Sequence, residues 1–244
     1  MPKVSKKNQE KTRHKIIEVA IDIMIQKGYE KATMREIARQ AGVGDATIYN
    51  YFATKEKIIW GYISLRINQA NNLISQVKGL AEFSLQEKLQ LYFEFILQGY
   101  LPDRELLPEA FKRTHQSFLT HGSQLKEVNR LFLDQIKLFL AQAIASNEIP
   151  DQPIDTLIPH IILDVYFIIV LYWLKDTSDQ FTKTTEFMDL ILQLLVSILQ
   201  QDIISKFIGV GSFLIRHHLF SQINSVLDNT GLSSFQAELK KFTS

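Results

Sequence analysis

Two predicted helices joined by a glycine turn, within TMREIARQAGVGDATIYNYFATKEKI at residues 33–58, constrain the fold of this chain more than any other segment. Thr33 and Glu36 have the capping-box spacing, in which each side chain satisfies an amide at a helix start. Gly42 can adopt the left-handed conformation that ends many helices, and Val43 offers the apolar contact that accompanies such an end. The apolar face of the first helix consists of Met34, Ile37, Ala38 and Ala41.

The second predicted helix is short, about residues 45–52. Ile48 and Phe52 are four apart and are expected to point inward. Asp45 lies in the first turn, where the helix dipole favours an acid. The side chains left for a partner are Thr47, Asn50 and Tyr51.

An upstream helix completes a three-helix unit with one shared core, and a long helix follows this unit. Residues 9–27 carry an apolar stripe and end at Gly28, while Thr54 is the expected N-cap of a long helix that runs to about Val77. An ordinary three-helix subdomain would have the same outline, because glycine turns between helices are common.

The charge distribution favours a nucleic-acid partner over that alternative. Residues 1–66 hold 13 Lys and Arg against 7 Asp and Glu, whereas the remaining residues hold 14 against 19. A basic head on an acidic body suits attraction to phosphate. Four lysines near the N-terminus form either a flexible arm that reaches phosphates or a solvated tail: Lys3, Lys6, Lys7 and Lys11.

The stretch from Ile16 through Ile58 resembles the N-terminal domain of the TetR family of bacterial transcriptional regulators. The matching motifs are AxxxxxxxGYExATMREIARQAGV from Ala20, ATIYNYF at 46–52 and TKEKI at 54–58. The resemblance implies an all-α homodimer with two domains. Residues 1–54 would form a three-helix helix-turn-helix DNA-binding domain. Residues 55–244 would form a larger helical effector-binding and dimerisation domain, with 203–244 as a C-terminal extension.

The resemblance also assigns roles on double-stranded DNA. Thr33 and Lys55 would hold phosphates, Tyr49 would bond to the backbone, and Thr47 and Tyr51 would reach a base or a phosphate. The complete predicted interface is Thr33, Arg35, Gly44, Asp45, Ala46, Thr47, Tyr49, Asn50, Tyr51 and Lys55.

One position departs from the family pattern. Gly44 stands where the family often has Ser or Thr as the N-cap of the recognition helix, and Asp45 follows it. An acid near the groove repels phosphate unless it accepts a hydrogen bond from a cytosine amine.

Composition excludes several other classes of protein. A chain of 244 residues can bury a second core, and without cysteine it has neither disulfides nor thiolate metal sites. The basic, polar N-terminus does not resemble a secretory signal, and the apolar run at 157–174 is interrupted by Pro159, His160 and Asp164. We therefore expect a cytoplasmic protein that does not enter the membrane, with no cofactor, no metal site and no enzymatic activity.

The larger domain is also predicted to be helical. Ser84 and Glu87 form a second capping box, further helices are expected at 105–120, 124–146, 154–175 and 181–201, and 147–153 reads as a loop. The helix at 154–175 reads as buried and apolar on all sides. In the family, the last two of these helices pack against their copy in a dimer, and internal core is the alternative. The extension at 203–244 is either a membrane-surface helix or, as we prefer, a segment that covers the domain or extends the dimer interface.

A small-molecule effector is expected in an aromatic interior, and the same residues serve equally well as plain core. Asp164 would orient a polar or cationic effector, or it would form a structural pair with His160, one turn earlier. The expected pocket consists of Phe93, Phe111, His115, Phe118, Asp164 and Phe167, with Phe132 and Tyr166 as further lining residues. The competing hypothesis is a helical enzyme or partner-binding protein that uses the head only as scaffold.

Overall fold

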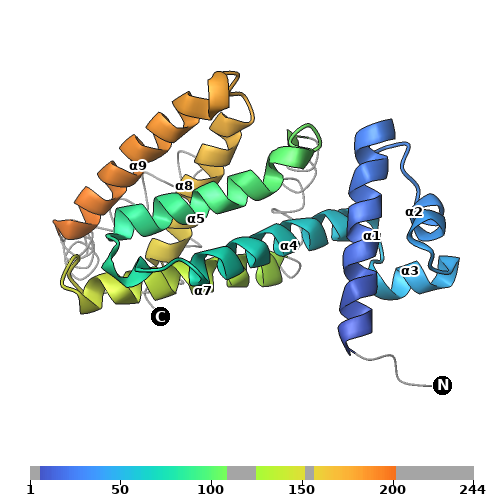
Figure 1. Cartoon of the computed structure of the whole chain (residues 1–244), viewed down its shortest axis with the longest axis horizontal. Helices are drawn as coiled ribbons and strands as arrows, with labels where there is room; N and C mark the ends of the chain where they lie inside the picture. Colours follow the sequence, from blue (N-terminus) through green and yellow to red (C-terminus); the bar gives the residue numbers. More distant parts are fainter. Residues whose placement is uncertain (1–5, 109–124, 152–156, 202–244) are drawn as a thin grey trace, which may run out of the picture.

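The computed structural model describes residues 6–108, 125–151 and 157–201, and every regular element in these ranges is helical (Figure 1). The head contains α1 (Lys6–Lys27), α2 (Met34–Ala41) and α3 (Asp45–Tyr51). The long helix α4 (Lys55–Ser75) leads from the head into the larger domain. That domain contains η1 (Leu80–Glu82), α5 (Leu85–Tyr100), η2 (Leu101–Asp103), α7 (Leu125–Ala145), α8 (Leu157–Trp173), η3 (Asp179–Phe181) and α9 (Thr182–Gln200).

The turn between α2 and α3 has the predicted geometry. The hydroxyl of Thr33 accepts a hydrogen bond from the Glu36 amide at 3.2 Å, and Gly42 ends α2 with φ 72°. The Val43 amide then donates to the Ala38 carbonyl at 2.9 Å. One expected detail differs, because the Glu36 carboxylate pairs with Lys27 at the end of α1. The cap of α2 is therefore joined to α1 by an ion pair.

Helix α4 packs on both domains, because it contacts α1 near its start and α5 and α7 further on. Thr54 caps it by accepting from the Lys57 amide at 3.3 Å. Gly61 allows a close approach to the head: a Cβ there would lie 2.8 Å from Phe52 Cε1 and 3.2 Å from Ile17 Cδ1. The absence of a side chain at this position brings α4 against the end of α3.

The larger domain is built around α5, whose capping box is complete. Ser84 Oγ accepts from the Glu87 amide at 3.3 Å, and the Glu87 carboxylate accepts from the Ser84 amide at 2.8 Å. The carboxylate of Glu148, just beyond α7, also accepts from the Leu85 amide at 2.7 Å. This bond sets the end of α7 beside the start of α5, so the two helices run antiparallel (Figure 1).

Most of the helix predictions are confirmed within the described residues, and three differ. Lys6, Lys7 and Lys11 lie in α1, so an arm that includes them is wrong. Helix α8 is not buried on all sides, because its outer face is exposed. The apolar stripe predicted on 181–201 is divided between two faces, since Leu195 is buried and Leu194 is 61% exposed.

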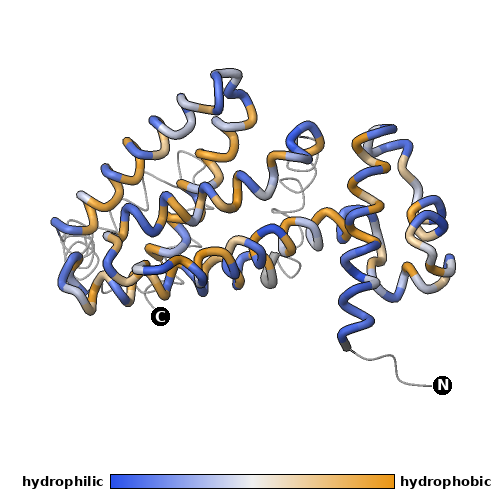
Figure 2. The backbone as a smooth tube through the Cα atoms, in the orientation of Figure 1, coloured by the Kyte–Doolittle hydropathy of each residue, from blue (hydrophilic) through white to orange (hydrophobic). Residues whose placement is uncertain are grey.

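Apolar and polar residues alternate along the helices of both domains (Figure 2). Large apolar side chains are buried in the interior, and others are exposed on α8 and α9. No helix in the described ranges is long and apolar enough to cross a membrane. Most of the helix expected at 105–120, the extension at 203–244 and the pocket residues Phe111, His115 and Phe118 lie outside the described residues.

Candidate nucleic-acid interface

The short helix α3 is anchored by two residues and exposes the rest. Ile48 is fully buried and Phe52, which ends the helix, is 3% exposed. Because these residues are four apart, the opposite side of α3 faces solvent. The exposed predicted residues are Thr33, Arg35, Gly44, Asp45, Ala46, Thr47, Tyr49 and Asn50. They lie together at the outer edge of the head, on α2, α3 and their caps.

Two predicted residues are less accessible. Tyr51 is partly buried and packs against the core, so its ring is held by the protein on one side. The ammonium of Lys55 donates to the Tyr29 carbonyl at 2.7 Å and lies 4.4 Å from the centre of the Tyr29 ring. Its role on phosphate stays a prediction, and in this structure it ties the turn after α1 to the start of α4.

Tyr29 and Glu56 complete this joint, a role that the sequence does not predict for either residue. The Tyr29 hydroxyl donates to the Glu56 carboxylate. Burial alone would raise the pKa of Glu56, but hydrogen bonds from Tyr29 and Thr54 lower it below its usual range. Glu56 is therefore ionised at neutral pH, and it fixes the first turn of α4 to the head.

The expected repulsion between Asp45 and DNA is moderated by a neighbour. Arg35 Nε donates to Asp45 Oδ2 at 2.9 Å, which pairs the acid with a base from the first turn of α2. Gly44 gives α3 no side-chain cap, as its sequence predicts.

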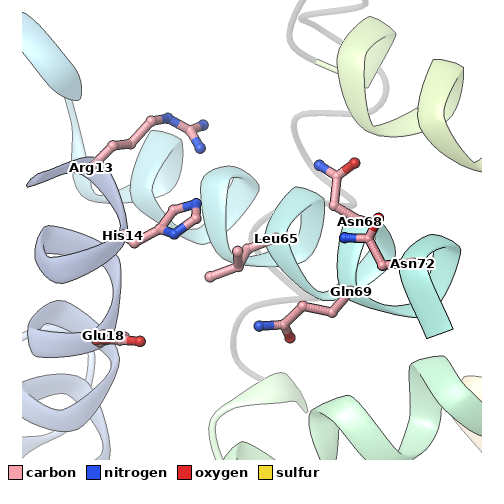
Figure 3. A pocket seen from close by; sticks show the side chains of 7 residues that line it. All are labelled: Arg13, His14, Glu18, Leu65, Asn68, Gln69 and Asn72. Atoms are coloured by element: carbon pink, nitrogen blue, oxygen red, sulfur yellow. The ribbon is translucent and has the colours of Figure 1, made fainter. Parts of the chain in front are cut away.

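A cleft of about 320 Å³ lies between α1 and α4, where the head meets the connecting helix (Figure 3). Its walls carry Arg13, His14 and Glu18 from α1 and Leu65, Asn68, Gln69 and Asn72 from α4. The side chains are mostly polar, and the Arg13 guanidinium also lies 5.1 Å from the centre of the Phe52 ring. The cleft is therefore a largely polar hollow between part of α1 and part of α4.

The interior of the larger domain is aromatic, as predicted. Phe93 and Phe132 are fully buried, and Tyr166 lies 5.3 Å from Phe93 and 5.0 Å from Phe132 between ring centres. Phe167 is half-buried, and its ring centre is 5.7 Å from that of Tyr166. The prediction that Asp164 lies in this interior is wrong, because its side chain is exposed on the outer face of α8. The helical period turns it away from the interior that Tyr166 enters.

A buried polar network links the middle of α4 to η2, and sequence reasoning missed it. The Tyr62 hydroxyl and the Arg66 guanidinium, one helical turn apart, each donate to Asp103 Oδ2 at 2.8 Å. Burial raises the pKa of Tyr62, and it raises that of nearby Tyr100 to about 12, so both phenols are neutral. The i, i+4 spacing of an aromatic and a basic residue was the available signal.

Arg104, the residue after Asp103, contacts the segment that joins α8 to α9. Arg104 donates to the backbone carbonyls of Trp173 and Asp176, each at 2.6 Å, at the end of α8. Its guanidinium also lies 4.7 Å from the centre of the Phe181 ring. Two consecutive residues, Asp103 and Arg104, therefore join α4 to the α8–α9 connection.

The outer face of α8 and α9 carries large apolar side chains that nothing in the described chain covers. The residues concerned are Ile168, Leu171, Tyr172, Leu190 and Leu194, which are 39–61% exposed. Partly buried Phe187 adds to this face, since its ring stacks on Tyr172 at 4.6 Å. We call these residues the α8–α9 face. Contiguous exposed apolar side chains of this kind mark an interaction surface.

Known proteins agree with this arrangement of a helix-turn-helix head on a helical body. The family model for bacterial regulatory proteins of the TetR family matches residues 16–59, and that for the tetracyclin repressor-like C-terminal domain matches 88–214. The second match alone spans more than half of the chain. The protein belongs to the TetR family, and it is a DNA-binding transcriptional regulator rather than an enzyme.

Individual relatives support the same conclusion. The fatty acid metabolism regulator protein of Bacillus subtilis is 28% identical over 137 residues, 56% of this chain and 70% of that protein. A TetR-family regulator from Syntrophomonas wolfei has a similar fold, with TM-score 0.61 and 23% identity over 78% of this chain and 96% of its own. The repressor FadR of Thermus thermophilus, solved with lauroyl-CoA, gives TM-score 0.57 and 20% identity over 75% and 93%. Regulators of this family bind DNA, dimerise and respond to small molecules.

Proposed function

We propose that the protein is an effector-responsive repressor that acts as a cytoplasmic homodimer, with α3 of each copy in the major groove of a near-palindromic operator. The observation that carries this proposal is the division of α3 into a buried side and an exposed one. Ile48 and Phe52 fix the helix, and the residues around it face outward from a head with net charge +6 over 1–66. A basic head attracts the duplex, and a rigid short helix can then read base edges.

The interface residues divide into two groups by chemistry. Thr33, Tyr49 and Lys55 are assigned to phosphates, which position the protein without reading sequence. Thr47, Asn50 and Tyr51 are assigned to base edges, because they project from the helix that enters the groove. The lack of large side chains at Gly44 and Ala46 allows the N-terminus of α3 to approach the bases.

The dimer contact is assigned to the α8–α9 face. A single head reads too few bases for specificity, so two copies must be held at a fixed separation of about one helical turn, ~34–36 Å. This face is supported because five of the exposed large apolar side chains gather on α8 and α9, whereas Leu73, Leu101 and Leu138 lie on separate elements.

The effector is proposed to be an acyl thioester, with its hydrocarbon chain among the aromatic rings between α5, α7 and α8. Phe93 and Phe167 belong to this interior, and Phe111, His115 and Phe118 remain proposed lining residues outside the described chain. Two observations support an acyl thioester: the Bacillus subtilis relative is named a fatty acid metabolism regulator, and the Thermus thermophilus repressor was solved with lauroyl-CoA. The exposure of Asp164 removes the main argument for a cationic effector.

Asp103 and Arg104 supply a route from the effector to the head. An acyl chain entering beside α5 must displace packed rings, and η2 follows α5 directly. Because Asp103 binds Tyr62 and Arg66 of α4, movement of η2 would move the connecting helix. The heads would then lose the spacing needed to engage both half-sites together.

The first experiment is selection of bound fragments from genomic DNA by the purified protein, followed by binding to the selected operator. Tyr49→Phe and Lys55→Ala should weaken binding to every sequence, whereas changes at Thr47 or Tyr51 should alter which sequence is preferred. Equal loss on all sequences for all four variants would refute the assignment to bases.

The effector is tested separately by titrating the protein–operator complex with acyl-CoA of several chain lengths. Long-chain acyl-CoA should release the operator, and free coenzyme A, the matched control without the hydrocarbon chain, should not. Release by free coenzyme A, or by neither ligand, would refute the acyl assignment without affecting the DNA assignment.

A further inference from the structure

The ion pair between Arg35 and Asp45 joins the two helices of the helix-turn-helix on their exposed side. Arg35 lies in the first turn of α2, and Asp45 is the first residue of α3, on the far side of the Gly42 turn. The bond runs from Arg35 Nε to Asp45 Oδ2 at 2.9 Å. The N-terminal part of a recognition helix is the part that meets base edges, so this pair stands where sequence is read.

The atoms used in the bond decide what remains for a partner. A guanidinium has one Nε and two terminal nitrogens in a fixed plane. Asp45 takes Nε, which fixes the plane and leaves the terminal nitrogens of Arg35 outside this bond. A free end of this shape matches the O6 and N7 acceptors that guanine presents in the major groove.

The ion pair between Arg35 and Asp45 adds little to the stability of the free protein. The side chains of Arg35 and Asp45 are 86% and 56% exposed, and ion pairs this exposed contribute little to folding. Docking on DNA removes water from both groups, and the attraction between them then strengthens. The interaction gains importance only when the duplex is present.

We infer that Asp45 is a positioning residue that holds the Arg35 guanidinium for bidentate recognition of a guanine near the N-terminus of α3. This inference rests on the proposed binding of α3 to the major groove. It explains why an acid is tolerated beside the phosphates, since its charge is paired with Arg35. It also assigns a G·C pair to the operator at the position under this end of the helix.

Simple electrostatics predicts a different result for the loss of Asp45. Removing a negative charge near phosphates should raise affinity for every sequence, with no change in preference. The positioning role predicts instead that preference at one base pair is lost while affinity for unrelated DNA is unchanged or raised. These two results are separable in one assay.

The experiment measures competition between the selected operator and operators substituted at one base pair at a time. For the wild-type protein, replacing the assigned G·C pair with A·T should weaken binding roughly 5- to 150-fold, the range for a good bidentate contact. Asp45→Ala should reduce that factor to below about 3-fold. Asp45→Asn keeps an acceptor for Arg35 Nε and should retain part of it. Arg35→Ala removes the guanidinium and should lose discrimination at the same pair.

Matched controls separate charge from position. Asp22→Ala removes an exposed acid from α1, and Arg39→Ala removes an exposed base from the last turn of α2. Both variants should keep the wild-type preference at the assigned pair. Melting temperatures of all variants, measured alongside, should stay within a few degrees of wild type because the changed groups are exposed.

Three outcomes would overturn the inference. One is unchanged preference in Asp45→Ala, whether overall affinity rises or falls. Another is a preference that depends on Asp45 but survives Arg35→Ala, which would mean that Asp45 itself reads a cytosine amine. The third is the absence of any G·C preference in the wild-type protein that still binds DNA in a salt-dependent manner. Loss of all salt-dependent binding by the wild type would refute the proposed function itself.

Discussion

Leu194→Glu is expected to separate the two copies of the protein. Leu194, Leu190, Leu171 and Ile168 are 61%, 58%, 55% and 49% exposed in the single chain. Full burial of such a side chain contributes about 1.5–3 kcal/mol, so covering the exposed half contributes about 1 kcal/mol. Four of them in each of two copies amount to roughly 8 kcal/mol before the cost of association.

In a symmetric dimer, the Leu194→Glu substitution is present in both copies of the interface. Losing the leucine from both copies removes about 2 kcal/mol, which weakens the dimer roughly 30-fold. Burying a glutamate in each copy weakens it further, because the charged group loses its hydration. We expect monomers at micromolar concentration by sedimentation equilibrium, with an unchanged far-ultraviolet spectrum.

The matched control is Leu138→Glu, which makes the same change at a 51% exposed leucine on α7. This variant should remain dimeric and should bind the full operator like the wild type. A Leu194→Glu protein with the wild-type dissociation constant would refute the assignment of the α8–α9 face. Equal dissociation of both variants would refute it as well, because the effect would then be independent of position.

Three further predictions concern the joints of the structure. Gly61→Ala should lower the midpoint of thermal unfolding, because the added methyl group is overpacked against the buried Phe52 ring. Overpacking costs about 1–3 kcal/mol, and the gain in helix propensity offsets at most about 1 kcal/mol. An increased midpoint would contradict this prediction. Hydrogen bonds from Ser178 and Thr184 hold the pKa of Asp176 well below its usual range, so the contribution of this carboxylate to stability is present at neutral pH and lost in acid. Asp176→Asn should therefore flatten the acid limb of the pH–stability curve, and an unchanged limb would show that other carboxylates dominate. Asn68→Trp should fill the α1–α4 cleft and weaken binding to the full operator more than to a half-site; equal losses would exclude a role of the cleft in head spacing.

The head could be predicted in detail because its signals are local. Capping at Thr33 and Thr54, the left-handed Gly42 and the inward pair Ile48 and Phe52 all involve residues close in sequence. The joint made by Tyr29 with Glu56 could not be predicted, since it joins residues 27 apart whose types occur on any surface.

For the larger domain, the sequence predicts which segments are helical but not which side of each helix is buried. Helix α8 is apolar around most of its circumference, so periodicity does not distinguish an interior side from a side that meets another copy. For that reason the apolar run predicts an interior position for Asp164, and the exposure of its side chain shows that a carboxylate in such a run can mark the outer face. The Asp103 network depends on tertiary packing of η2 against α4, which no local pattern specifies.

The central claim, that the outward side of α3 meets a DNA duplex, is tested most directly by the salt dependence of operator binding. The logarithm of the binding constant should fall steeply with the logarithm of salt concentration, by about 0.9 for each phosphate neutralised. Tyr49→Phe should lower affinity on all sequences, and Thr47→Ala should change base preference with the slope preserved. Binding that is absent in dilute salt, or that is indifferent to every substitution on α3, would contradict the account.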